Sequence, residues 1–266
     1  MYFRFLFIRP NSSIPMQRSK TGIQGLDKAL NGGFPEGNLV LLSGGAGTGK
    51  STMAMQYLVN GATLFGEKGL YISTEQNEEE LQKAASQFGW RLVDLENKNL
   101  LKVVYFKVLE QDHFIQKVEE LVQTFKPKRI VIDSLTTLTD FMMMSELQKD
   151  VGVSLIKIVD TVSPIPRTEQ IVTKIILYNL VNKLKEFEST VLMTSELPEG
   201  SPRLSADGVT EFVTDGVILL GYLAVGATDF RSMRIRKMRY TDHEKGSLTY
   251  NLSPTGIDIT AENNIL

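Results

Sequence analysis

Residues 38–51 read Asn-Leu-Val-Leu-Leu-Ser-Gly-Gly-Ala-Gly-Thr-Gly-Lys-Ser, an apolar run that passes directly into a glycine-rich loop. The apolar part, Asn38–Ser43, predicts a buried strand, and a helical pattern follows from Gly49 to about Phe65. The segment Gly44–Ser51 matches the pattern G-x-x-x-x-G-K-S/T. A strand, this loop and a helix in that order form the context in which the pattern binds nucleotide phosphates. An ordinary glycine-rich turn is the alternative.

The residue types of this loop suit an anion. Glycines let backbone N–H groups curl around phosphate oxygens without Cβ clashes, and the helix that follows points its positive end at the same place. Lys50 would supply a cation for the β- and γ-phosphates, and the Ser51 hydroxyl would be a ligand of Mg²⁺. The residues expected to bind the nucleotide are Gly45, Ala46, Gly47, Thr48, Gly49, Lys50, Ser51 and Thr52.

Two carboxylates end apolar strands. Asp133 closes the predicted strand Arg129–Asp133, and Glu75 follows the predicted strand Gly69–Thr74. Ligands of open α/β sheets bind outside the carboxyl ends of the strands. Asp133 could therefore hold the Mg²⁺ shell together with Ser51, and Glu75 could orient or activate an attacking water. The alternatives are a helix N-cap, provided by Asp133 or by Ser134, and for Glu75 a solvated acid in an acidic helix turn.

A predicted strand near the C-terminus is rich in cations. Residues 231–239 contain five lysine and arginine side chains. A period of two places Met233, Ile235, Lys237 and Arg239 on one face, so that the last two would project at the end of the strand. Three roles remain open for them: an arginine-finger device in phosphoryl transfer, a phosphate contact in nucleic acid, and a charged edge that blocks aggregation.

The order of elements predicts an α/β fold. Apolar runs alternate with helical patterns as far as Ser195, which is typical of a mainly parallel sheet flanked by crossover helices. After Gly216 the chain is rich in strands and punctuated by glycine, which predicts antiparallel hairpins at one edge of the sheet. We expect one domain, residues 16–266. Residues 1–15 are expected to be a mobile tail, or a stretch that precedes the true start at Met16. The alternative is an aromatic arm that docks on a neighbouring subunit.

One internal stretch is less regular. Between Phe141 and Glu188 the pattern indicates two helices, roughly Ser145–Val159 and Arg167–Phe187, with a loop before the first and another between them.

Composition limits the possible functions. The 266 residues are 42% hydrophobic and carry a net charge of −2, so no strong global field for nucleic acid or acidic membranes is evident. The chain has no cysteine, which excludes disulfides, thiolate zinc sites and cysteine nucleophiles. No run of about 18 apolar residues occurs, so no membrane-spanning helix is expected, and we expect a cytoplasmic protein.

The segment before the glycine loop is more specific than the loop itself. Residues 20–37 read Lys-Thr-Gly-Ile-Gln-Gly-Leu-Asp-Lys-Ala-Leu-Asn-Gly-Gly-Phe-Pro-Glu-Gly, which resembles the RecA/RadA/KaiC superfamily. The sequence Lys-Met-Arg-Tyr-Thr-Asp-His at 237–243 resembles the C-terminal end of KaiC-type domains. The resemblance covers residues 18–260 and implies a RecA-like P-loop NTPase, similar to the single-domain KaiC-like ATPases common in archaea.

The resemblance implies roles for particular residues. It makes ATP and Mg²⁺ the expected cofactors, and Lys50 and Glu75 catalytic residues. KaiC domains usually carry a second glutamate where this chain has Gln76, so slow or altered turnover is expected. Lys237 and Arg239 match the K-x-R pair that reaches the γ-phosphate of a neighbouring subunit. A ring, expected to be a hexamer with ATP at the subunit interfaces, is therefore implied.

The function implied is a Mg²⁺-dependent ATPase that acts as a nucleotide-gated ring in regulation or signalling, with an unknown protein partner. Alternatives are a DNA-binding accessory of recombination or repair, an ATP-dependent protein kinase or autokinase, and a scaffold that binds ATP without hydrolysing it. DNA would contact the expected loops 134–145 and 196–211. The second loop is mainly acidic, which does not favour nucleic acid.

Overall fold

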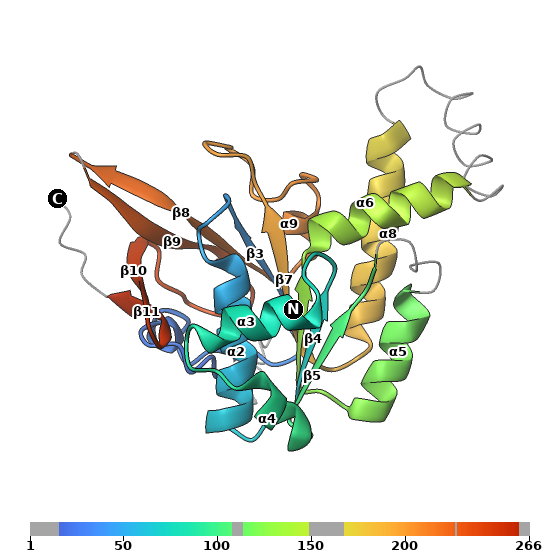
Figure 1. Ribbon diagram of the computed structural model, residues 1–266. Coiled ribbons are helices and arrows are strands. Elements are labelled where there is room, and N and C mark those ends of the chain that lie inside the picture. Colours follow the sequence, from blue (N-terminus) through green and yellow to red (C-terminus); the bar gives the residue numbers. More distant parts are fainter. Residues whose placement is uncertain (1–15, 108–113, 149–167, 227, 261–266) are drawn as a thin grey trace, which may run out of the picture.

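The computed structural model describes residues 16–107, 114–148, 168–226 and 228–260 (Figure 1). The expected tail or arm, residues 1–15, lies outside these ranges. The part of the expected helix Ser145–Val159 that follows residue 148 lies outside them as well.

A nine-stranded sheet in the order β11-β10-β9-β8-β3-β7-β6-β4-β5 forms the centre of the described structure. Pairs among β3 to β8 are parallel, whereas β8–β9, β9–β10 and β10–β11 are antiparallel. The predicted parallel sheet with C-terminal hairpins at one edge is confirmed. The strands are β3 (Leu39–Gly44), β4 (Gly69–Ser73), β5 (Leu101–Tyr105), β6 (Arg129–Asp133), β7 (Thr190–Glu196), β8 (Gly216–Val225), β9 (Thr228–Met238), β10 (Ser247–Ser253) and β11 (Gly256–Thr260).

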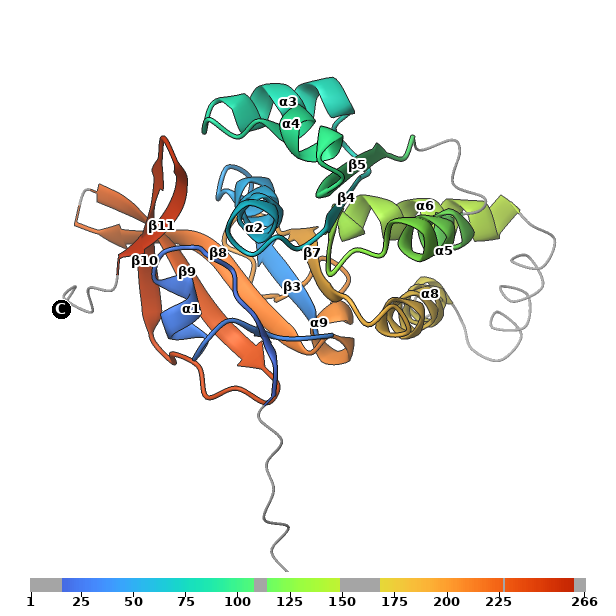
Figure 2. The same cartoon turned by 90° about the horizontal axis from the view of Figure 1, so that it is seen from below.

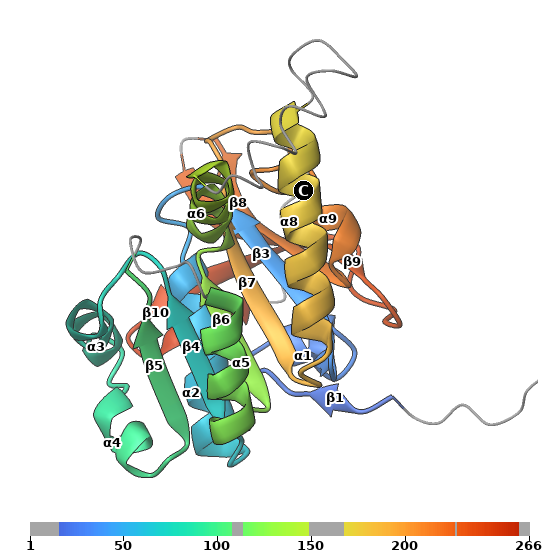
Figure 3. The same cartoon turned by 90° about the vertical axis from the view of Figure 1, so that its right-hand side faces the viewer.

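Helices cover both faces of this sheet (Figures 2 and 3). Because side chains alternate along a strand, β3 places Val40 and Leu42 in one buried cluster and Leu39 and Leu41 in the other. The first cluster includes residues of α2, α3 and α4, and the second includes residues of α5, α6 and α8. The helices are α1 (Leu26–Ala29), α2 (Lys50–Leu64), α3 (Glu78–Ser86), α4 (Leu92–Asn97), α5 (Phe114–Phe125), α6 (Leu135–Gln148), α8 (Thr168–Lys185) and α9 (Thr210–Val213).

The segment before β3 is anchored by one carboxylate. Oδ1 of Asp27 accepts from the backbone N–H of Thr21 at 2.7 Å, and Oδ2 accepts from that of Gly22 at 3.0 Å. A short antiparallel pair, β1 (Arg18–Ser19) with β2 (Phe34–Pro35), closes this segment. These contacts fix the approach of the chain to the strand that leads into the glycine loop.

Helix α6 corrects one expectation. The region 134–145, expected to be a loop that could face DNA, is helical from Leu135. The Ser134 hydroxyl accepts from the backbone N–H of Thr137 at 3.2 Å, which is the bonding pattern of a helix N-cap. The expected helix Arg167–Phe187 is observed as α8. Within the described ranges, none of the helices combines the length and apolarity required to cross a membrane.

Candidate functional site

The glycine loop joins β3 to α2 at the carboxyl edge of the parallel strands (Figure 1). A Cβ atom at Gly44 would lie 2.5 Å from the backbone oxygen of Leu220, so no larger residue fits there. Gly47 and Gly49 have positive φ angles of 72° and 90°, which favour glycine. No side chain in the described part of the chain caps the start of α2. The first N–H groups of this helix are therefore available to an anion.

Lys50, the first residue of α2, lies over this loop. Its side chain is 7% exposed, and its Nζ donates to the backbone oxygen of Gly45 at 3.0 Å. The same Nζ lies 3.8 Å from Oε1 of Glu196 at the end of β7. Ser51 is exposed and Thr52 is half-buried, so both can be reached from the loop side. These positions fit the residues predicted to bind phosphate.

Asp133 lies at the carboxyl end of β6 and is held by two hydroxyl groups. The Tyr71 hydroxyl donates to Oδ2 at 2.5 Å, and the Thr194 hydroxyl donates to Oδ1 at 2.5 Å. Burial, followed by the nearby Asp133 carboxylate, raises the pKa of Tyr71 well above its usual value, so this hydroxyl remains a donor. Tyr71, the hydrogen-bond partner of Asp133, lines the same small cavity as Ser51.

The residues present fit a nucleotide-bound magnesium ion better than a metal held by protein alone. No group of three or more His, Cys, Asp or Glu side chains that could hold a metal occurs among the described residues. Mg²⁺ commonly takes one or two protein oxygens and completes its shell with phosphates and waters. Ser51 and Asp133 supply oxygens of this kind beside a loop shaped for phosphate.

Glu75 is exposed just beyond the end of β4, and the start of α6 positions it. Its Oε1 accepts from the hydroxyls of Ser134 at 2.5 Å and Thr137 at 2.6 Å. Two bonds to one oxygen fix the direction of the carboxylate. The sequence reasoning missed these two hydroxyls and that of Tyr71. The sequence contained a signal for the two hydroxyls on Glu75, because Ser134 and Thr137 follow soon after Asp133 at the carboxyl end of a predicted strand.

Lys237 and Arg239 do not lie at the glycine loop of their own chain. Lys237 pairs with Val217 on β8, whereas Gly44 at the loop pairs with Leu220, three residues further along the same strand. The offset is about 10 Å along the strands. The four expected catalytic residues are thus divided between two places, with Lys50 and Glu75 at the loop edge and these two cations toward the opposite edge.

The prediction that Lys237 lies on the same face of the strand as Met233 and Ile235 was wrong. A register irregularity leaves Ile235 opposite Ile218 and Lys237 opposite Val217, so Arg236 is an extra residue in β9. Such a bulge reverses the alternation of side chains. Met233, Ile235 and Met238 are accordingly buried in one cluster.

Both cations contact their own chain. Lys237 Nζ donates to the backbone oxygen of Thr214 at 2.6 Å, and Arg239 Nη1 to Oδ1 of Asp215 at 2.7 Å. Burial, followed by the charge of Arg239, lowers the pKa of Lys237.

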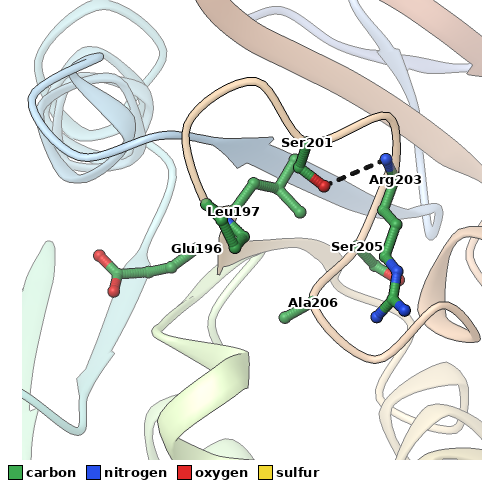
Figure 4. Close-up of a pocket in the computed structure, with 7 residues that line it drawn as sticks. Glu196, Leu197, Ser201, Arg203, Ser205 and Ala206 are labelled. Atoms are coloured by element: carbon green, nitrogen blue, oxygen red, sulfur yellow. Dashed lines mark hydrogen bonds between the residues drawn. The ribbon is translucent and has the colours of Figure 1, made fainter.

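A cavity of about 490 Å³ lies between the end of β7 and the loop that follows it (Figure 4). The backbone N–H of Leu197 donates to the Gly44 oxygen at 3.0 Å, which places this loop beside the glycine loop. The Glu196 carboxylate points away from Arg203, the cation that lines the cavity (Figure 4). The cavity is lined by Glu196, Leu197, Pro198, Ser201, Arg203, Ser205 and Ala206.

The family model for the KaiC ATPase matches residues 19–153 and 141–264. The chain belongs to the KaiC ATPase family. The circadian clock oscillator protein KaiC of Synechococcus elongatus is 29% identical over 263 residues, which cover 94% of this chain and 46% of that protein. The protein of the same name from Parasynechococcus marenigrum is 27% identical over 259 residues, with the same two coverages. The chain thus spans about half the length of these KaiC relatives.

A solved structure agrees with the family match. The crystal structure of a KaiC-like protein from the hyperthermophilic archaeon Pyrococcus horikoshii OT3 matches with a TM-score of 0.75 and 31% identity, covering 92% of this chain and 100% of that one. The fold is therefore RecA-like and of the KaiC type, as the residues before the glycine loop predicted.

Proposed function

We propose that this chain binds ATP with Mg²⁺ and hydrolyses it slowly, as the subunit of a nucleotide-gated ring that acts in regulation or signalling. The observation that carries the proposal is the uncapped start of α2, with Lys50 over a loop whose glycines leave room for phosphate. Membership of the KaiC family supports ATP as the nucleotide.

The roles follow from the contacts. The Lys50 ammonium would exchange the Gly45 oxygen and the Glu196 carboxylate for phosphate oxygens. Ser51 and Asp133 would hold Mg²⁺, which when bound neutralises charge on the phosphates. Glu75, fixed through one oxygen, would orient the attacking water with the other.

The position of the two cations supports assembly. Lys237 and Arg239 are about 10 Å from their own glycine loop along the strands, so a γ-phosphate contact would require a second copy of the chain. A ring with ATP at each interface meets this requirement, and a hexamer is the form we propose. A single chain would then bind nucleotide but lack part of the catalytic site.

A nucleic-acid function is less well supported. One of the two loops expected to contact DNA is the helix α6, and the other carries Glu196, Glu199, Asp207 and Glu211 against Arg203. Acidic side chains oppose binding to a phosphate backbone.

The test combines solution mass with phosphate release. The wild-type protein should assemble in Mg·ATP and release phosphate, and both effects should require Mg²⁺. Lys50→Ala should lower phosphate release by at least about 100-fold, because a preorganised charge beside the phosphates is lost. Lys98→Ala removes an exposed lysine at the end of α4 and serves as the control. Wild-type phosphate release by Lys50→Ala would refute the proposal.

A further inference from the structure

Two tyrosines from the C-terminal strands donate hydrogen bonds to backbone oxygens of the glycine loop. The Tyr222 hydroxyl on β8 donates to the backbone oxygen of Gly47 at 3.1 Å. The Tyr250 hydroxyl on β10 donates to the backbone oxygen of Thr48. Two successive carbonyl groups of the loop are thus bound by side chains that come from different strands.

These contacts fix the direction of two amide groups. In a trans peptide the C=O of one residue and the N–H of the next point in opposite directions. With the Gly47 oxygen turned toward Tyr222, the N–H of Thr48 points away from that tyrosine. With the Thr48 oxygen turned toward Tyr250, the N–H of Gly49 points away in the same manner.

Without these two hydrogen bonds, the peptide groups of the loop could change direction. Gly47 and Gly49 flank Thr48 and both have positive φ, and glycine moves readily between backbone conformations. Reversal of either peptide would replace an N–H donor with an oxygen atom on the side of the phosphates. A carbonyl oxygen there would repel the anion rather than bind it.

The two tyrosines differ in exposure, because Tyr250 is buried and Tyr222 is exposed. Tyr250 is 2% exposed, and burial raises the pKa of its hydroxyl well above the usual value, so the group remains a donor. The Arg231 guanidinium lies 5.8 Å from the centre of the Tyr222 ring on the neighbouring strand. The hairpin β10–β11 is tied to α2 because Gln56 donates to the Ile257 oxygen at 3.1 Å and accepts from its N–H at 2.7 Å.

We propose that Tyr222 and Tyr250 are positioning residues that hold the Gly47–Gly49 peptides with their N–H groups toward the nucleotide phosphates. This inference rests on the proposed ATP-binding function and adds a role for the C-terminal hairpins. The tyrosines touch the loop and not the phosphates, so they act on affinity through the shape of the cradle.

The test replaces each tyrosine by phenylalanine, which removes one hydroxyl and keeps the ring. Loss of one hydrogen bond that restrains the loop should raise KM and Kd for Mg·ATP about fivefold in Tyr250→Phe and in Tyr222→Phe. The double variant should be weaker than either. At saturating ATP, kcat should fall by less than twofold, because the catalytic groups are intact. Inorganic pyrophosphate probes the phosphate-binding loop alone, and its Kd should rise by the same factor in each variant.

A matched control separates positioning from stability. Tyr57 on α2 is also buried, and its hydroxyl bonds to the Ser19 hydroxyl at 2.8 Å, away from the loop. Tyr57→Phe should lower the unfolding temperature without raising KM. If Tyr250→Phe does not fold, the exposed Tyr222 still provides the measurement.

Two results would overturn the inference differently. If the wild-type protein binds Mg·ATP and both loop variants bind it equally well, the positioning role is wrong and the proposed function stands. If the wild-type protein binds neither Mg·ATP nor pyrophosphate, the proposed function fails and this inference fails with it.

Discussion

Replacement of Glu196 by glutamine should strengthen nucleotide binding, although Glu196 lies at the edge of the site. The Lys50 Nζ lies 3.8 Å from Oε1 of the Glu196 carboxylate. A phosphate that binds Lys50 must compete with this carboxylate and then remain close to its negative charge. Glutamine keeps the size of the side chain and removes both effects.

The magnitude follows from the exposure of the pair. Glu196 is 57% exposed, so the interaction with Lys50 belongs to the weak class of about 0.2–1 kcal/mol. The corresponding change is up to about fivefold in affinity, since 1.4 kcal/mol is a factor of 10. We therefore expect Glu196→Gln to lower the Kd for Mg·ATP by about 1.4- to fivefold. The gain should shrink at high salt, because ions screen exposed charges.

The assay is calorimetric titration of Mg·ATP at low and high salt. Glu199→Gln is the matched control, because it removes the same charge from the same loop at another exposed position. The control should change Kd by much less than Glu196→Gln does. If Glu196→Gln weakens binding, the carboxylate assists the nucleotide or its metal, and the reasoning is refuted. An effect equal to that of Glu199→Gln would refute the specific contact with Lys50.

Two further substitutions test the carboxylates. Tyr71→Phe should lower the free energy of unfolding of the nucleotide-free protein by about 2 kcal/mol in urea titrations, because Asp133 loses a buried hydrogen bond from a hydroxyl. Unchanged stability would mean that Asp133 does not depend on this bond. Glu75→Gln should lower kcat at least about 100-fold and leave Kd for Mg·ATP within about twofold, since the carboxylate would act on water and not on phosphate. A large rise in Kd would contradict the role given to Glu75.

Much of the fold was predictable because its signals are local. Buried parallel strands are continuous apolar runs, and β3, β4 and β6 were each predicted within about one residue at either end. The glycine loop and Asp133 followed from their places at the ends of such strands. The N-cap of α3 is a local signal of the same kind, because Asn77 and Glu80, three residues apart, form a complete capping box.

Other features depend on contacts that a linear pattern does not contain. A helix start at Asp133 or Ser134 was left open as an alternative, but its tertiary contacts could not be predicted. The Ser134 hydroxyl donates to Glu75, and that of Thr136 lies close to that of Ser195. The bulge at Arg236 was missed because alternation was assumed to continue along β9. Pairing with β8 decides where an extra residue is inserted, and neither strand shows this alone.

The C-terminal hairpins, predicted as additions to one edge of the sheet, connect two distant parts of the molecule. Tyr222 on β8 lies past the level of the last residue of β3 and contacts the glycine loop. Lys237 on β9 lies three residues before that level and binds the backbone near Asp215. Since β8 and β9 pair along their whole length, a shift of one end would be resisted by the other. In the proposed ring, the strands that shape the cradle of one subunit would therefore also present Lys237 and Arg239 to the next.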